Sequence, residues 1–144
     1  QERVRAEKLG APPAPIVASD IDASYVAMAQ KSALKARVEK YMTFATRRFQ
    51  DCEPCAATGL LVTNLPYGDR IGSREGDVRQ LYEEVGDTLK AKFSGWQAAI
   101  LAASASPYKA IGLRPSRTIA LMNGSIPCKL LLFELYAGSR RATT

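Results

Sequence analysis

The residues best suited to chemistry in this sequence stand where an apolar run ends. Residues 60–63 lead directly into Asn64, Leu65, Pro66 and Tyr67. Pro66 stiffens the turn and biases Leu65 toward an extended backbone, which holds the Leu65 carbonyl beside the Asn64 side-chain oxygen. Two fixed acceptors suit a planar NH2 group, and Tyr67 offers a ring on which a flat base can stack. The alternative is a type I turn with a packed tyrosine.

A second polar signal follows an earlier apolar run, residues 16–19. Asp20 ends this run, and Asp22 stands two residues further on. Asp22 is well placed to cap the following helix, which leaves Asp20 free to accept hydrogen bonds from both hydroxyls of a cofactor ribose. The alternative is that Asp20 itself is the helix cap.

Cys52 and Cys55 form a Cys-x-x-Cys pair around Pro54. A structural zinc ion needs four ligands, whereas the sequence offers only Cys128 in addition and contains no histidine. We therefore expect reduced thiols and no metal site, with the pair serving as small residues in a turn.

The order of the patterns predicts an α/β fold with a mainly parallel sheet. Strands are expected at 16–19, 41–45, 60–63, 97–103, 117–121 and 129–136. Helices are expected at 1–9, after Asp22, from near Asp77, and at 107–112. The inner face of the second helix is predicted to carry Val26, Ala29, Ala33 and Leu34, and that of the third Val78, Leu81, Tyr82, Val85, Leu89 and Phe93.

The connection between the last two strands is too short for a helical crossover, so these strands are predicted to pair as an antiparallel hairpin. In open α/β sheets, ligands bind beyond the carboxyl ends of the strands. We therefore expect Asp20 and Asn64 to converge on one crevice.

Composition limits the classes of function. The 144 residues suffice for one domain or part of one. A formal net charge of +6 favours a polyanionic partner such as nucleic acid. The sequence shows no apolar run long enough to span a membrane and no signal-peptide core, so we expect a cytoplasmic protein without a membrane partner.

Several stretches together resemble the large-subunit (23S) rRNA guanine-N2 methyltransferases, which are class I S-adenosylmethionine-dependent enzymes. The central one resembles the [Asn/Asp/Ser]-Pro-Pro-[Tyr/Phe] signature of amino-group methyltransferases. The similarity runs from about residue 16 to 136. The matching stretches are Ser-Asp-Ile-Asp (19–22), Val-Thr-Asn-Leu-Pro-Tyr-Gly-Asp-Arg (62–70), Leu-Tyr-Glu-Glu-Val-Gly-Asp-Thr-Leu-Lys (81–90), Gly-Trp (95–96), Gly-Leu-Arg (112–114) and Asn-Gly-Ser-Ile-Pro-Cys (123–128).

This resemblance implies a Rossmann-like class I sheet and methyl transfer from S-adenosyl-L-methionine to the exocyclic N2 of a guanine in 23S rRNA. It divides the chain into a lead-in and linker (1–15), a partial catalytic domain (16–137) and a tail (138–144).

The family's site residues fall on two stretches of this sequence. The resemblance assigns the cofactor ribose to Asp20 and packing against the adenine to Ile21. It implies that Asn64 and the Leu65 carbonyl hold the target amine, with Asn64 also facing the cofactor. Pro66 shapes the turn, and Tyr67 stacks on the flipped base.

The sequence departs from the family at three places. Leu65 replaces the proline at the second motif position. Arg48 stands where members often carry an acid that contacts the adenine, and it cannot accept a hydrogen bond. The glycine-rich loop and first strand are absent, and that strand would lie between the 16–19 and 60–63 strands. We therefore expect a piece of a larger enzyme that binds S-adenosylmethionine weakly and is inactive alone.

Two other kinds of function stay open. The same turn serves methylation of adenine N6 in DNA or RNA, or of a glutamine amide in protein. A non-catalytic nucleic-acid-binding domain with a methyltransferase fold is the third class. The sequence leaves the methylated nucleotide and the oligomeric state open.

Overall fold

The computed structural model describes residues 11–67 and 75–137. The chain falls into two compact units, Gln1–Cys55 and Ala56–Thr144, and each is described by itself. The predicted helix over 1–9 and the tail from 138 lie outside the described residues. None of the helices in the described ranges is both long and apolar enough to cross a membrane.

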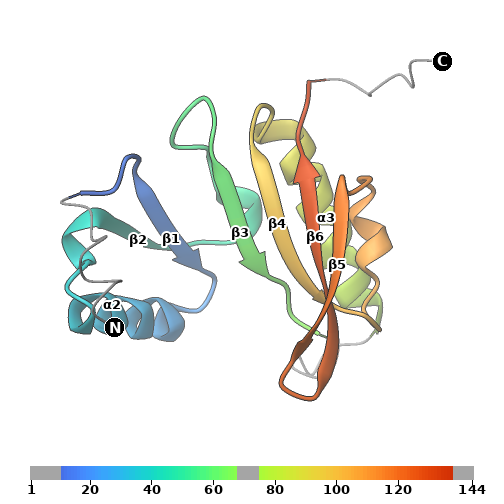
Figure 1. The fold of residues 1–144 in the computed structure, drawn as a ribbon, viewed down its shortest axis with the longest axis horizontal. Coiled ribbons are helices and arrows are strands. Elements are labelled where there is room, and N and C mark those ends of the chain that lie inside the picture. Colours follow the sequence, from blue (N-terminus) through green and yellow to red (C-terminus); the bar gives the residue numbers. More distant parts are fainter. Residues whose placement is uncertain (1–10, 68–74, 138–144) are drawn as a thin grey trace. The chain divides into compact units, whose positions relative to one another are not determined.

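The first unit contains a two-stranded parallel sheet (Figure 1). Strand β1 spans Ile16–Asp20 and strand β2 spans Met42–Thr46. Helix α2, Ala23–Lys35, connects them, and short 3-10 helices η1 (Glu39–Tyr41) and η2 (Phe49–Asp51) flank β2. The predicted strands are therefore confirmed, except that Tyr41 lies in η1.

Helix α2 begins as predicted, with Asp22 as its N-cap. The carboxylate accepts hydrogen bonds from the Ser24 backbone N–H (2.8 Å) and hydroxyl (2.7 Å). The side-chain hydrogen bond from Ser24 contributes most to lowering the pKa of Asp22, because it stabilises the charged form. On the inner face, Val26 and Ala33 are buried. The prediction was wrong for Ala29 and Leu34, which are both exposed. Leu34 is 62% exposed because one residue rotates about 100° around the helix from the buried Ala33.

The second unit contains a four-stranded sheet in the order β3-β4-β6-β5 (Figure 1). Its strands are β3 (Leu60–Asn64), β4 (Gln97–Ala103), β5 (Arg117–Asn123) and β6 (Ile126–Glu134). Strands β3 and β4 are parallel, whereas β6 is antiparallel to both β4 and β5. The predicted α/β class with a C-terminal antiparallel hairpin is confirmed. Gly124, with φ 61°, supplies the left-handed residue of the two-residue hairpin turn.

Helix α3, Glu75–Lys92, lies across one face of this sheet (Figure 1). The predicted inner face is largely confirmed: Leu81 is half-buried, and the others are buried, namely Val78, Tyr82, Val85, Leu89 and Phe93. The helix also packs closely on the 3-10 helix η4, Tyr108–Ile111. A Cβ built on Gly86 would lie only 1.8 Å from the Ile111 carbonyl oxygen, so this contact requires glycine.

Strand β3 is less buried than its apolar sequence predicts. Leu60 is 60% exposed and Val62 is 70% exposed. Side chains alternate along a strand, and α3 covers only one face of the sheet, so Leu60 and Val62 fall on the other face. Among the described strands, β1 pairs only with β2, and β3 only with β4. Each therefore keeps one edge without a partner among the described strands.

Candidate functional site

The candidate site begins where β3 ends. Asn64 is exposed and is the last residue of the strand. The Leu65 N–H still donates to the Leu101 carbonyl on β4 (3.0 Å), and the Leu65 side chain is buried at 5% exposure. Leu65 thus anchors the turn, while Asn64 projects from it. No residue in the described part of the chain donates a backbone hydrogen bond to the Leu65 carbonyl.

Tyr67 is half-buried, and its hydroxyl group has three polar neighbours. The hydroxyl donates to Asn64 Oδ1 at 3.3 Å. It accepts from Asn123 Nδ2 at 2.9 Å and, at 3.9 Å, from the buried Cys128 thiol. Asn123 and Cys128 belong to the β5–β6 hairpin, so the hairpin and the turn after β3 meet at this oxygen.

Helix α3 supports the turn from beneath. The Tyr82 side chain is fully buried, and its hydroxyl donates to the Pro66 carbonyl at 3.4 Å, a long hydrogen bond. Burial raises the pKa of Tyr82, so it remains a protonated donor at neutral pH. The turn is therefore held by β4, by α3 and by the hairpin.

This arrangement presents acceptors to an incoming donor. An amide oxygen has two lone pairs, and Tyr67 uses one of those on Asn64 Oδ1. The Leu65 carbonyl belongs to the neighbouring residue. Asn64 Oδ1 and the Leu65 carbonyl oxygen can therefore each accept one further hydrogen bond.

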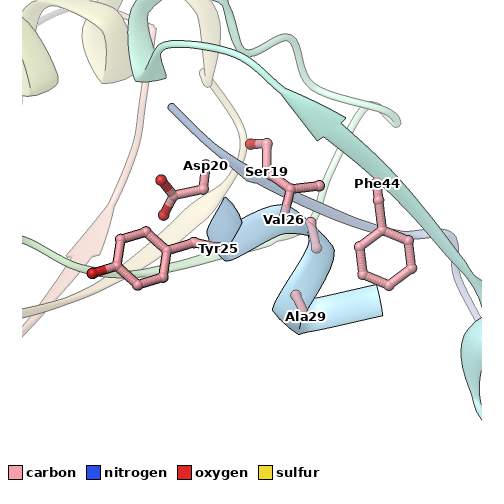
Figure 2. Close-up of a pocket in the computed structure, with 7 residues that line it drawn as sticks. Ser19, Asp20, Tyr25, Val26, Ala29 and Phe44 are labelled. Carbon is pink, nitrogen blue, oxygen red and sulfur yellow. The ribbon is translucent and has the colours of Figure 1, made fainter. Parts of the chain in front are cut away.

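In the first unit, Asp20 lies at the carboxyl end of β1. Its Oδ1 accepts the Asp22 N–H at 2.8 Å, which fixes the carboxylate at the exposed end of the strand. Ile21, next in the chain, is 69% exposed. Asp20 also lines a pocket between the sheet and α2 (Figure 2). The other lining residues are Ala18, Ser19, Tyr25, Val26, Ala29 and Phe44.

Figure 2 shows the Asp20 carboxylate and the Tyr25 ring on the same side of this pocket. Asp20 and Asn64 belong to different compact units. Their convergence on one crevice therefore stays a prediction.

The three cysteines are free thiols. Cys52 lies 3.5 Å from the Ser19 hydroxyl and donates weakly to the Arg48 carbonyl at 3.6 Å. Within the described ranges, no three cysteine, aspartate or glutamate side chains gather as a metal site would require.

Sequence reasoning missed three residues around the turn: Tyr82, Asn123 and Cys128. Tyr82 was expected only as a core residue. The stretch 123–128 was one of the matching stretches, yet nothing in its local pattern indicated a partner. The contact from Asn123 to Tyr67 joins residues 56 positions apart, which local sequence does not reveal.

Comparison with known proteins assigns the family. The family model described as "RMKL-like, methyltransferase domain" matches residues 1–131. The chain belongs to this family. The resemblance drawn from the sequence is thereby confirmed at the family level.

Individual relatives of this methyltransferase domain agree. The ribosomal RNA large subunit methyltransferase K/L of Shewanella sp. (strain ANA-3) is 37% identical over 126 residues, covering 88% of this chain and 18% of the relative. The crystal structure of SMU.472 complexed with SAH is 28% identical with a TM-score of 0.75, covering 88% of this chain and 32% of that one.

A third relative is named a predicted N6-adenine-specific DNA methylase, from Listeria monocytogenes. It is 27% identical with a TM-score of 0.69, covering 83% of this chain and 30% of that one. The chain spans only 18% to 32% of the lengths of the first curated relatives that it matches.

Proposed function

We propose that this domain transfers a methyl group from S-adenosyl-L-methionine to the exocyclic N2 of a guanine in 23S rRNA. The observation that carries the proposal is the turn after β3. There the Tyr67 hydroxyl holds the side-chain oxygen of the exposed Asn64 at 3.3 Å, and the Leu65 carbonyl follows in the next residue. Family membership supports the reaction type.

The turn acts on the amine. The lone pair of an exocyclic amine is delocalised into the base, which makes the nitrogen a poor nucleophile. Hydrogen bonds from its two hydrogens to Asn64 Oδ1 and the Leu65 carbonyl favour a pyramidal nitrogen whose lone pair points outward. The same two oxygens stabilise the positive charge that grows on nitrogen. With the cofactor bound, the N–C bond would form as the bond between the methyl group and the cofactor sulfur breaks with its electron pair left on sulfur, and one N–H proton would then leave to solvent.

Tyr67 positions the base. The target base must leave its stack to reach the turn, and an aromatic ring repays part of that cost by stacking. The three polar neighbours of the Tyr67 hydroxyl hold the ring in one orientation. Because the acceptors act by position and charge, no strong general base is needed, and a chain without histidine suffices.

The first unit suits the cofactor's sugar. When bound, S-adenosyl-L-methionine supplies an activated methyl group. Asp20 Oδ1 is engaged by Asp22, and no residue in the described part of the chain donates to Oδ2, so this oxygen is open to a ribose hydroxyl. The exposed Ile21 side chain then packs against the adenine. Asn64 also faces the cofactor in this proposal.

Guanine in RNA is favoured over the alternatives. The net charge of +6 suits a polyanion, and the matching Shewanella enzyme is named for ribosomal RNA. Adenine N6 in DNA is the second candidate, because the Listeria relative carries that name. Both amines fit a pair of oxygen acceptors, so the two candidates are distinguished by the identity of the methylated nucleoside.

The test uses the intact protein, S-adenosylmethionine with a labelled methyl group, and 23S rRNA from cells lacking the gene. Nucleoside mass spectrometry should find N2-methylguanosine, and a transcript with inosine at the target should accept no methyl group because inosine lacks the N2 amine. Labelled N6-methyladenosine, or full activity on the inosine transcript, would overturn the assignment.

A further inference from the structure

We propose that Asn123 is a positioning residue that fixes the orientation of the Asn64 amide through the Tyr67 hydroxyl. The inference rests on the proposed function, because it gives a reason why the oxygen of Asn64, and not its NH2 group, faces the substrate amine. It extends the role of the tip of the β5–β6 hairpin from holding the Tyr67 ring to orienting the Asn64 amide.

The first step of the argument concerns the Tyr67 oxygen. A phenol oxygen has two lone pairs and one hydrogen. Asn123 Nδ2 donates to it at 2.9 Å, and the Cys128 thiol approaches at 3.9 Å. Both of these neighbours are donors, so they occupy the lone-pair side. The single hydrogen is left to point at Asn64 Oδ1, 3.3 Å away.

The second step concerns the Asn64 amide. Its oxygen and its NH2 group are similar in size, so shape alone does not select which of them faces the site. An NH2 group facing the substrate would oppose the hydrogens of another amine. The Tyr67 hydrogen can bond to Oδ1 but not to Nδ2, because the amide nitrogen is a donor only. Tyr67 thereby selects one of the two orientations of the amide.

The third step concerns how Asn123 reaches Tyr67. Asn123 ends β5 and pairs with Ile126 across the two-residue turn. In the sheet, β6 and β4 separate β5 from β3. Neighbouring strands therefore do not bring the two residues together, and the contact depends on where the hairpin ends. A change in hairpin length or turn would move Asn123 away from Tyr67.

The test compares initial rates of methyl transfer by the intact protein and four variants: Asn123→Ala, Asn123→Asp, Tyr67→Phe and the double variant Asn123→Ala/Tyr67→Phe. Loss of one hydrogen bond lowers kcat about 3- to 10-fold in Asn123→Ala, with KM for the cofactor unchanged. Asn123→Asp keeps the shape but accepts the Tyr67 hydrogen, so it should be at least as slow. Ser125→Ala, in the same exposed turn, is the matched control and keeps the wild-type rate.

The double variant distinguishes positioning from mere stability of the hairpin. If Asn123 acts through the Tyr67 hydroxyl, adding Asn123→Ala to the Tyr67→Phe variant lowers the rate no further. The effects of the two substitutions are then non-additive. If Asn123 had a purely structural role, Asn123→Ala would slow the Tyr67→Phe variant by the same factor by which it slows the wild type. That additive result, or a wild-type kcat in Asn123→Ala, would overturn the inference.

A second readout does not depend on turnover. With asparagine labelled by ¹⁵N, the Asn64 side-chain amide signals should shift or split in Asn123→Ala and Asn123→Asp but not in Ser125→Ala. Unchanged Asn64 signals would reject the relay even in an active enzyme. Shifted signals in a protein that methylates no RNA would support the relay and reject the proposed function.

Discussion

At the end of β1, two aspartates two residues apart make different hydrogen bonds. Asp22 Oδ1 receives both the backbone N–H and the hydroxyl of Ser24, so it is committed to the N-terminus of α2. Asp20 is held by the Asp22 N–H through Oδ1 alone. The sequence predicted the cap at Asp22, because capping depends on short-range spacing. The second oxygen of Asp20 is what we propose for the ribose.

Replacing Asp20 with asparagine tests that assignment with little change in shape. The amide loses the charge and turns one acceptor into a donor, so hydrogen bonds from the ribose hydroxyls weaken. We expect the Kd for S-adenosylmethionine, measured by calorimetry on the intact protein, to rise about 10- to 100-fold, as expected for hydrogen bonds to a charged group.

The matched control for this variant is Asp22→Asn. Asparagine caps helices as well as aspartate does, so α2 stays intact and the cofactor Kd stays at the wild-type value. Equal affinities of the Asp20→Asn variant and the wild type would remove Asp20 from the cofactor site.

Helix α3 is one of the elements that support the turn after β3. Its buried Tyr82 reaches the Pro66 carbonyl, and its Gly86 lies against the backbone of η4. The helix and its inner face were predictable, because an amphipathic period is a local pattern. The need for glycine at position 86 was not, because it arises from Ile111, which is distant in sequence.

Gly86→Ala tests this packing. A methyl group 1.8 Å from the Ile111 carbonyl oxygen forces α3 and η4 apart, at a cost of about 1–3 kcal/mol. Hydrogen exchange of the α3 amides in the intact protein should speed up accordingly. Asp87→Ala, at a neighbouring exposed position, should change the free energy of opening obtained from exchange by less than about 0.5 kcal/mol. Equal exchange rates of the α3 amides in both variants would show that η4 moves away from the added methyl group without loss of stability.

At the scale of the whole molecule, sequence patterns predicted where the strands lie along the chain better than how far their side chains are buried. Leu60 and Val62 form part of an apolar run, yet they are exposed, because burial depends on what lies across a face and not on the strand itself. The contact of Asn123 could not be predicted for the same reason, because it depends on the tertiary structure and not on the local sequence. Its contact with Tyr67 joins the end of β5 to the turn after β3, and these are the two outer strands of the four-stranded sheet.

The most direct test of the central claim, that Asn64 is an oxygen acceptor for the target amine, is the single-turnover rate of Asn64→Ala in the intact protein with saturating cofactor. Removing one positioned electrostatic group lowers the rate of the chemical step about 10²- to 10³-fold. The Kd for S-adenosylmethionine, which we attribute mainly to Asp20, should change little. A wild-type single-turnover rate in Asn64→Ala would contradict the account.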